Sequence, residues 1–395
     1  MRSFLLGLVP GLVFVPMWAQ APPLTYESIL QRARVSPEQY RTEVMLADRQ
    51  VQLSSTKGFL RDGPTVGYSA GPRRVEGLPT TTDQGLDIDF PLFLSIGARR
   101  RLEAALGQAD PVLREAAKRE ATFHLRQAYL NAWLEERLVQ IREADLETVR
   151  TWLRTAQVRF EVGADPAFQV SLVEGELLKA QLDVDDTRAR RAQAWAVLRV
   201  LAEVPEAPQP LAEPGPISPQ AEGELRAHYE TAPLRRALQS RLELEEQGVR
   251  LQAAQAQSRW SLRGSYAKEG EDRITKFGVA YRFSRPGEGA ALRRSTEAQV
   301  MSIHRDTEMA LAELDGRFQV LLQRLQDLPM VETPKDFTPA IQAVSLRLQE
   351  GKERPSEALP MRRQLIEAQA SALKRFHAAH MLQAECAAMT EGGSR

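Results

Sequence analysis

The strongest constraint on the fold of this 395-residue chain is a long helical pattern of apolar residues at 97–160. Apolar residues recur there at alternating steps of three and four, the spacing of a coiled-coil seam. The positions are Leu102, Leu106, Ala109, Leu113 and Ala116, and then Leu146, Val149, Leu153, Ala156 and Phe160. A helix of about 64 residues at 1.5 Å per residue is ~95 Å long, several times the width of a compact domain. The sequence therefore predicts an elongated, mainly helical molecule, with a kink or a first turn at Pro111.

The chain is expected to reverse direction at the end of this helix. Gly163 suits the left-handed position that closes a helix, and Asp165 before Pro166 predicts an N-terminal cap for the next one. The 3-4 spacing then continues at Val170, Val173, Leu177, Ala180 and Val184. The two segments together predict an antiparallel helical hairpin.

The same plan returns about 190 residues later, which indicates an internal duplication. Helical stretches from 24 to 58 and from 225 to 257 are each broken near their start by a proline, Pro37 or Pro233, and Arg347 to Gly351 repeats the pattern of Arg159 to Gly163. A Pro-rich segment separates the two copies. We expect a first repeat at 21–205, a linker at 206–219 and a second repeat at 220–395. Three prolines predict that the second descending helix is bent or shorter: Pro329, Pro334 and Pro339.

Four short segments change from helical period to period two, which predicts β-strands. They form two hairpins, with expected turns at 71–83 and 268–273. Each strand has an apolar, partly aromatic face and a polar face. The apolar face would pack on a second sheet in a soluble sandwich and would face lipid in an outer-membrane barrel. Because four strands cannot close a barrel and an open edge is not tolerated in lipid, the membrane interpretation requires several chains to pool their strands.

The N-terminus has the pattern of a secretory signal peptide over residues 1–20. Arg2 supplies the positive charge, residues 4–15 are apolar, and small residues follow near Ala19 and Ala21. This order of charge, apolar run and small residues predicts export from the cytoplasm.

Composition excludes several classes of function. The 52 basic and 52 acidic side chains leave no surplus positive charge for nucleic acid, and the lone Cys386 excludes a disulfide framework and multi-thiolate metal sites. His377 and His380 are spaced to share a metal, but they also continue an apolar helical stripe, and the stripe is favoured. No Ser, His and Asp arrangement predicts an enzyme, and no cofactor is expected.

The order of several short motifs resembles the TolC-like outer-membrane efflux protein family over essentially the whole mature chain. The motifs are Pro64-Thr65-Val66, Asp89-Phe90-Pro91-Leu92-Phe93 with Gly97, Ala128-Tyr129, and the two Arg-x-x-x-Gly turns. Gly351 to Pro355 and the residues after it, to Arg363, are similar to the heavy-metal branch, which exports cobalt, zinc and cadmium. Each motif is weak alone, and their duplicated order carries the resemblance.

The resemblance implies a mainly α fold with a small β part. Long coiled-coil hairpins and four strands per chain would assemble as a homotrimer, with a 12-stranded outer-membrane barrel that continues into a periplasmic α-helical tunnel. The helical turns would form a tip that docks a periplasmic adaptor and, through it, an inner-membrane pump of the RND or ABC type. The tip residues are Arg159, Gly163, Asp165, Arg347, Gly351, Arg354 and Glu357.

The barrel that the resemblance implies gives each strand face a role. The residues expected to face outer-membrane lipid are Tyr68, Leu86, Ile88, Phe90, Trp260, Leu262, Tyr266, Phe277, Val279, Tyr281 and Phe283. The residues expected to line the lumen are Asp87, Asp89, Arg263, Lys276 and Arg282. Their mixed signs favour ordinary solvated alternation over charge selectivity. The expected function is a passive export duct; the alternative is a periplasmic coiled-coil adaptor or scaffold without a barrel.

Overall fold

The structure is a computed structural model. It describes residues 22–55, 65–74, 80–92, 96–215, 217, 221–257, 260–269, 272–281, 283, 287–327, 334 and 336–390. The predicted signal peptide 1–20 lies outside these residues, as do Pro64, Phe93, Arg282 and Pro329.

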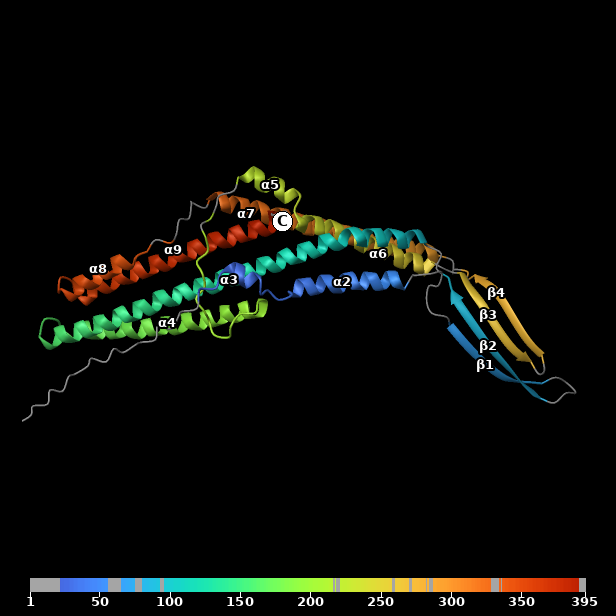
Figure 1. Ribbon diagram of the computed structural model, residues 1–395, viewed down its shortest axis with the longest axis horizontal. Coiled ribbons are helices and arrows are strands. Elements are labelled where there is room, and N and C mark those ends of the chain that lie inside the picture. Colours follow the sequence, from blue (N-terminus) through green and yellow to red (C-terminus); the bar gives the residue numbers. More distant parts are fainter. Residues whose placement is uncertain are drawn as a thin grey trace, which may run out of the picture.

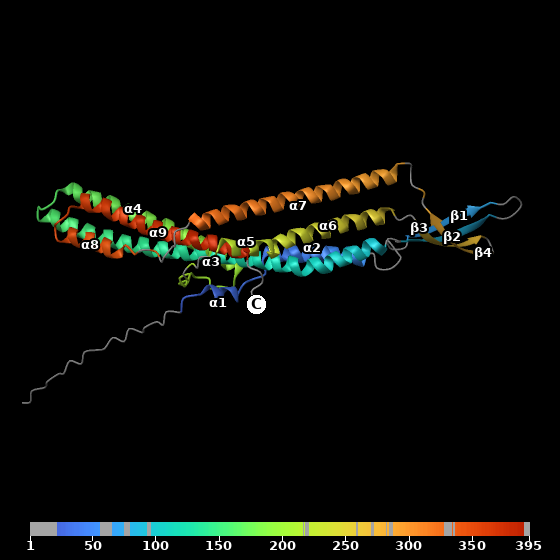
Figure 2. The ribbon, with the colours of Figure 1, turned by 90° about the horizontal axis from the view of Figure 1, so that it is seen from above.

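The molecule is a long helical body with a sheet at one end and two helical turns at the other (Figure 1). Its longest element, α3 (Ile96–Glu161), has 66 residues, which confirms the predicted long helix. Pro111 lies inside α3 and does not end it. The returning helix α4 (Ala167–Leu201) packs along α3 toward the middle of the body (Figure 2).

The order of elements is the same in the two halves of the chain. The first half has α1 (Tyr26–Leu30), α2 (Pro37–Ser54), β1 (Thr65–Arg73) and β2 (Thr81–Pro91) before α3 and α4. The second half has α5 (Glu222–Glu230), α6 (Pro233–Gln257), β3 (Trp260–Glu269), β4 (Asp272–Tyr281), α7 (Glu288–Asp327), α8 (Thr338–Gln349) and α9 (Pro355–Thr390). The second descending helix is divided into α7 and α8, as the prolines between them predict.

The start of α2 shows how local sequence sets a helix boundary. The Ser36 hydroxyl accepts a hydrogen bond from the Gln39 backbone N–H at 3.2 Å, and the Ser36 N–H donates to the Gln39 side chain at 2.8 Å. This capping box satisfies two backbone donors next to Pro37 at the first helical position. The second half keeps the proline, Pro233, but places Ala232 before it, which has no oxygen to cap the helix.

The four strands form one antiparallel sheet in the order β1-β2-β3-β4. Both predicted turns were too long: β1 continues to Arg73, β2 begins at Thr81, and Glu269 pairs directly with Asp272. The extra pairs are held by backbone hydrogen bonds, which a search for alternating apolar side chains does not detect. Pro72 is compatible with β1 because β1 lies at the edge of the sheet.

The core is a stripe of side chains along the helices instead of a compact interior. Near the sheet, α3 packs on α2 and α6 through Leu102, Leu244 and Leu251. Toward the turns, Trp152 and Leu348 lie in a second cluster that joins α3 to α8 and α9. The predicted seam residues Leu102, Leu106, Ala109, Leu113 and Ala116 are all buried.

The middle of the body holds the largest cluster, where the Pro-rich segment crosses back over the helices. Leu24 and Leu211 form a parallel bridge, and the Tyr129 hydroxyl donates to the Ala212 carbonyl at 2.6 Å. Trp195 donates its indole N–H to the Pro205 carbonyl at 3.0 Å. These contacts hold the described part of the linker against α1, α3 and α4.

Candidate functional site

The sheet separates apolar from polar side chains along most of its length, up to the ends with the hairpin turns. The register pairs Tyr68 with Leu86, Leu86 with Tyr266, and Leu262 with Val279, so these side chains share one face. The same parity places Ile88, Phe90, Trp260, Phe277 and Tyr281 on that face. Phe283 follows β4 and its ring packs edge-on against Tyr281, with 5.1 Å between the centroids. Contact of these residues with lipid stays a prediction.

The apolar face of the sheet is open. Phe277 is 86% exposed, Phe283 84% and Tyr68 68%, values that are unusual for large apolar side chains. The sheet lies beyond the ends of the long helices, so the helical body does not cover it (Figure 1). Such a surface needs a cover, which can be lipid or another protein chain.

The opposite face carries the predicted lumen residues. Asp89 pairs in register with Arg263, and their charged groups lie 3.6 Å apart. Asp87 shares that face with Lys276, because both pair with Ser265. Arg282 lies outside the described residues. Charges of both signs therefore alternate along this face, and a role in the lumen stays a prediction.

The first helical turn is closed by glycine and a buried ion pair. Gly163 has φ 72°, and the Ala164 N–H donates to the Arg159 carbonyl at 2.8 Å, which ends α3. The Arg159 guanidinium donates to the two carboxylate oxygens of Asp165 at 2.6 and 3.3 Å. The prediction that Asp165 caps α4 was wrong: Pro166 is the N-cap residue and no side chain caps it. The charge on Arg159 attracts the Asp165 carboxylate more strongly than a helix end does.

The second turn repeats this geometry with a different acid. Gly351 has φ 76°, and the Lys352 N–H donates to the Arg347 carbonyl at 2.9 Å. The partner of Arg347 is Glu353 at 3.0 Å, a residue that sequence reasoning missed. The signal was present, because both turns have an arginine, a glycine four positions later and an acid two positions after that.

Arg354 and Glu357, both predicted tip residues, lie at the start of α9. The Arg354 backbone N–H donates to the Glu357 carboxylate at 3.3 Å, a contact that ties the first turn of the helix to the residue before it. Glu357 is exposed beside the second turn. Its contact with an adaptor stays a prediction.

Side chains from the first hairpin hold the second one. Arg159 donates to the Leu348 carbonyl at 3.3 Å, at the end of α8. The buried Gln169 accepts from the Ser356 backbone N–H at 3.0 Å and donates to the Ser356 hydroxyl at 3.2 Å. These contacts between residues about 187 positions apart gave no signal in the sequence, because each polar residue alone resembles a solvated one.

A buried charge cluster lies further up the body, between α3, α4 and α9. The Arg362 guanidinium pairs with Asp145 and with Glu176, at 3.0 Å from the latter, and Arg363 also pairs with Glu176. Burial raises the pKa of the Asp145 carboxyl, and the charge of Arg362 opposes that shift. The cluster joins the two hairpins. Because its two arginines balance its two carboxylates, it leaves no unpaired charge for a substrate.

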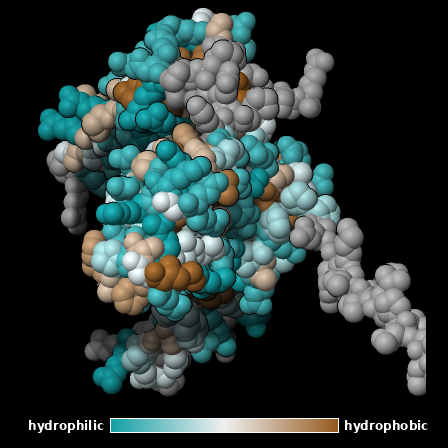
Figure 3. Space-filling view, turned by 90° about the vertical axis from the view of Figure 1, so that its left-hand side faces the viewer, coloured by the Kyte–Doolittle hydropathy of each residue, from teal (hydrophilic) through white to brown (hydrophobic). Residues whose placement is uncertain are grey.

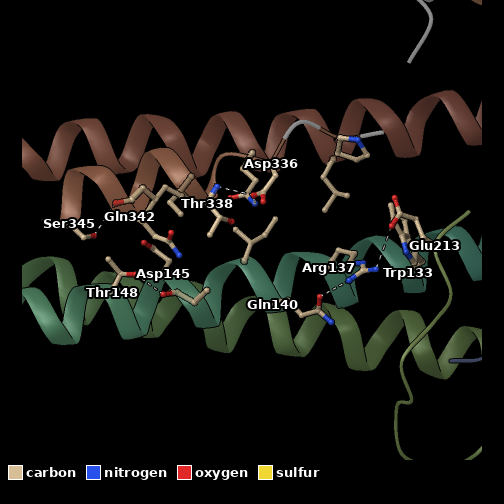
Figure 4. Close-up of a pocket in the computed structure, with 17 residues that line it drawn as sticks. Trp133, Arg137, Gln140, Asp145, Thr148, Glu213, Asp336, Thr338, Gln342 and Ser345 are labelled. Carbon is tan, nitrogen blue, oxygen red and sulfur yellow. Dashed lines mark hydrogen bonds and ion pairs between the residues drawn. The ribbon is translucent and has the colours of Figure 1, made fainter. Parts of the chain in front are cut away.

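A cleft of 640 Å³ opens between the hairpins beside this cluster (Figure 4). Several of its polar groups bind one another or the backbone: Arg137 donates to Gln140 at 3.0 Å, and Asp336 accepts from the Thr338 N–H at 2.9 Å. Hydrogen bonds from the Thr338 side chain and from its backbone N–H lower the pKa of Asp336. The buried indole N–H of Trp133 has no hydrogen-bond partner among the described residues. Among the described residues that line the cleft, none is His, Cys or Lys, so the arrangement offers neither a thiol nucleophile nor an imidazole base.

The histidine pair lies in the helical stripe that the sequence favoured. His380 is buried and packs edge-on against Phe376, and His377 bonds to Asn131 at 2.9 Å. Burial, helped by the positive charge of Arg126, lowers the pKa of His380 to about 4. Across the described residues, no group of three or more His, Cys, Asp or Glu side chains could hold a metal ion.

The view from the end with the two turns is mostly hydrophilic, with separate hydrophobic patches (Figure 3). Exposed apolar side chains near the first turn include Phe160, Val162 and Phe168, at 48%, 72% and 57%. None of the described helices has an apolar stretch long enough to cross a lipid bilayer.

The arrangement of a sheet at one end and helical turns at the other is found in solved outer-membrane channels. The Campylobacter jejuni CmeC outer membrane channel superposes with a TM-score of 0.69 at 13% identity, over 92% of this chain and 85% of that one. CusC, described as forming a transmembrane channel, gives 0.65 at 15% identity, over 93% and 92%. The outer membrane protein VceC of Vibrio cholerae gives 0.63 at 15% identity, over 93% and 96%.

This chain has the fold of these outer-membrane channels. Its helix content and its four-stranded antiparallel sheet confirm the predicted fold class. No family model matches the chain, and no curated protein sequence matches it. At these levels of identity the likeness shows the fold, and the activity is argued below from the surfaces of this chain.

Proposed function

We propose that this chain is a subunit of an outer-membrane channel of a tripartite efflux or type I secretion system. The observation that carries the proposal is the exposed apolar and aromatic face of the sheet, which ends in two open edges, β1 and β4. An open edge is not tolerated in lipid, so each edge must pair with another copy. Three copies would give a twelve-stranded barrel, with the apolar face toward lipid and Asp87, Asp89, Arg263 and Lys276 toward the lumen.

The helical body has open edges as well. Near the sheet, α2 and α7 flank α3 and α6, and each exposes apolar residues: Val44 and Val51 on α2, Met301 and Met309 on α7. Toward the turns, α4 exposes Leu178 and Leu182, at 61% each. In a trimer, the outer helices of one copy would pack on those of the next and close a tunnel. The exposed apolar faces at all three levels support this assembly.

The helical turns would then form the far end of the tunnel in the periplasm. We propose that they dock a periplasmic adaptor and, through it, an inner-membrane pump, with Arg159, Gly163 and Gly351 shaping the contact. The ion pairs Arg159–Asp165 and Arg347–Glu353 support this role because each closes one of two turns of the same shape. The bonds from Arg159 to Leu348 and from Ser356 to Gln169 hold the two turns side by side. The protein itself would be a passive duct for its cargo.

Fractionation of the producing cell tests the proposal. We expect the protein in the outer-membrane fraction, and we expect detergent to extract it as a trimer. A monomer in the soluble periplasmic fraction would contradict the channel and favour a coiled-coil adaptor or scaffold. Adjacent genes would identify the branch, because a metal-type pump beside an adaptor indicates heavy-metal efflux and a transporter ATPase indicates secretion.

Substitutions at the turns test the docking role separately. Gly351→Pro or Gly163→Trp should leave the trimer intact and abolish export, because each changes the shape of a turn without touching the sheet. Gly107→Ala is the matched control, since Gly107 is an exposed helical position with no atom within 4 Å of an added Cβ. Normal export with both turn variants would argue against these turns as the docking site.

A further inference from the structure

The described sheet has two open edges, formed by β1 and β4 at opposite sides of the four strands (Figure 1). Each strand is antiparallel to its neighbour, so β1 and β4 also run in opposite directions. Three strand spacings separate the two edges, about 14 Å, and four strands cannot close a barrel on their own. The backbone groups that point outward along each edge therefore need a partner from outside the chain.

A second copy of this chain fits these edges in one combination. Like edges can pair antiparallel, as β1 with β1 or β4 with β4, but the two helical bodies then point in opposite directions. Like edges can also pair in parallel, but the two apolar faces then lie on opposite sides of the joined sheet. Only β4 against the β1 of the next copy keeps the strands antiparallel, the helical bodies on one side and the apolar faces together.

The closure of a barrel limits the register of this contact. Thr65, Asp89, Arg263 and Gly278 face one another in a row across the sheet. In a twelve-stranded barrel whose strands tilt by about 35–45°, such a row climbs about 12–18 residues in one circuit, or about 4–6 per copy. Only even steps keep the apolar face continuous, and a step toward the start of β1 would carry the row off the strand. The row therefore continues from Gly278 to the residue four or six positions after Thr65.

The length of the contact favours the step of four. It places Gly278 opposite Ser69 of the next copy and joins 274–281 to 66–73, all within the observed strands β4 and β1. This gives eight residue pairs, the same number as between β2 and β3 inside the chain. A step of six would leave only six pairs and more unpaired backbone at an edge, which lipid does not tolerate.

The apolar side chains of the two edges also suit the step of four. It places Tyr281 opposite Val66 of the next copy, and Val279 opposite Tyr68. In one copy these four side chains are 43%, 59%, 62% and 68% exposed, respectively. Both combinations join an aromatic to a β-branched residue, which are favourable cross-strand pairs. The contact would therefore cover apolar surface that a single copy leaves open.

We propose that β4 of one copy pairs with β1 of the next in this register, with Gly278 opposite Ser69. This inference rests on the proposed function, because it requires three copies to close one barrel. The seam between copies is then as long as the internal seam between β2 and β3. The strands, and not the helices alone, hold the copies together and fix how they are aligned.

Disulfide cross-linking between introduced cysteines tests the register. Cys386 is the only cysteine of the chain, so Cys386→Ala gives a background without thiols. Ser69→Cys is combined there with Gly278→Cys, and an added Cβ at Gly278 meets no atom within 4 Å in one copy. Directly opposite residues have Cα atoms about 4.5–5.5 Å apart, within the range of a disulfide. Within one copy the two positions lie on opposite edges, at least ~14 Å apart, so a disulfide between them joins two copies.

We expect oxidation of the detergent-extracted protein to convert most chains to covalent trimers on a denaturing gel without reductant. A second pair in the same register, Gly67→Cys with Ala280→Cys, should do the same and replaces the first pair if that variant does not assemble.

Two further pairs are the controls. Ser69→Cys with Ile274→Cys lies on the same polar face but four residues out of register, about 14 Å along the strand, and should stay uncrosslinked. Ser261→Cys with Ala280→Cys lies opposite within one chain. It should lose its thiols on oxidation without joining chains, which shows that the oxidant reaches this face.

The other outcomes separate this inference from the proposed function. A trimer in which Gly278→Cys joins Gly71→Cys instead of Ser69→Cys would overturn this register and leave the channel in place. A trimer that neither in-register pair crosslinks, although the oxidation control reacts, would overturn the strand seam and leave the contacts between helices. Crosslinking of the Ile274 pair as strongly as the in-register pairs would show that no register is fixed and would overturn the inference as well. A native protein that is monomeric in detergent would overturn the proposed function and this inference with it.

Discussion

The two halves of the chain share one plan, yet the helix that follows the strands is buried to very different extents in the two. In the first half α3 buries 21 residues over 66, whereas α7, its counterpart in the second half, buries four over 40. The first hairpin, α3 with α4, forms a continuous pair, whereas α8 and α9 are held by side chains of the first: Asp145, Arg159, Gln169 and Glu176. The comparison shows that a duplicated sequence pattern produces similar helices in both halves of the chain. Contacts between the two halves then decide which helix is buried inside the body.

Removing the Arg362 side chain should weaken the attachment of the second hairpin to the first. The Arg362→Ala variant leaves the buried Asp145 without its cation, while Glu176 keeps Arg363, so we expect the free energy of unfolding to fall by about 3–5 kcal/mol. Denaturant unfolding of the protein in detergent measures it. The matched control is Arg363→Ala, whose side chain is half exposed, with an expected loss below ~1 kcal/mol. Equal losses in the two variants would mean that the buried cluster does not join the hairpins.

The pH dependence of stability should identify His380 of α9 as part of the contact with α3. Its pKa is about 4 in the folded protein and about 6.5 when unfolded, so the unfolded state gains protons first as pH falls. The contribution of neutral His380 to the free energy of unfolding is complete above pH 6.5. It is lost as the pH falls from 6.5 to 4, and the loss totals at most about 3 kcal/mol. Unfolding midpoints at several pH values measure the slope.

A His380→Leu variant should show a shallower loss over that pH range than the native protein. An unchanged slope in His380→Leu would show that His380 is not held neutral by its burial against α3.

The ion pairs of the two turns should contribute different amounts to the free energy of unfolding. Asp165 is buried and Arg159 nearly so, whereas the Arg347 side chain is 61% exposed. We expect Asp165→Asn to lower the free energy of unfolding by about 2 kcal/mol, because it leaves a partly buried guanidinium without its partner. Glu353→Gln should cost less than ~1 kcal/mol. Thermal unfolding of the two variants side by side compares them, and a larger effect at Glu353 would reverse this ranking.

Substitutions at the two turn glycines should differ least in their effect on the free energy of unfolding. Both have positive φ, so Gly163→Ala and Gly351→Ala should each cost about 1 kcal/mol. The Gly351 variant should lose slightly more, since its added Cβ would lie 3.3 Å from the Arg159 Nη1, whereas nothing lies within 4 Å at Gly163. The same thermal unfolding measures both, with Gly107→Ala as a control at normal φ. Identical losses would indicate that Arg159 moves aside freely.

Much of the fold could be predicted from the sequence because its signals are local and repeated. The 3-4 spacing of Leu102 to Ala116 predicted the buried seam, and alternation predicted both hairpins of the sheet. Strand ends were predicted less well, because Glu269 and Asp272 pair through the backbone and their side chains give no apolar alternation. The interpretation of Asp165 as a cap failed because the Arg159 guanidinium, six residues earlier, competes with the helix end for the carboxylate.

The sequence by itself determined the elements of this protein: two long helical hairpins, two strand pairs with one apolar face each, and two glycine turns. Periodicity and the backbone preferences of glycine and proline are short-range effects, so they are readable without the fold. Only the tertiary structure decided which partners the polar residues have. Gln169 joins the start of α4 to the start of α9, and Arg362 joins α9 to α3 and α4. Such contacts depend on distances between residues far apart in the chain, which packing alone sets.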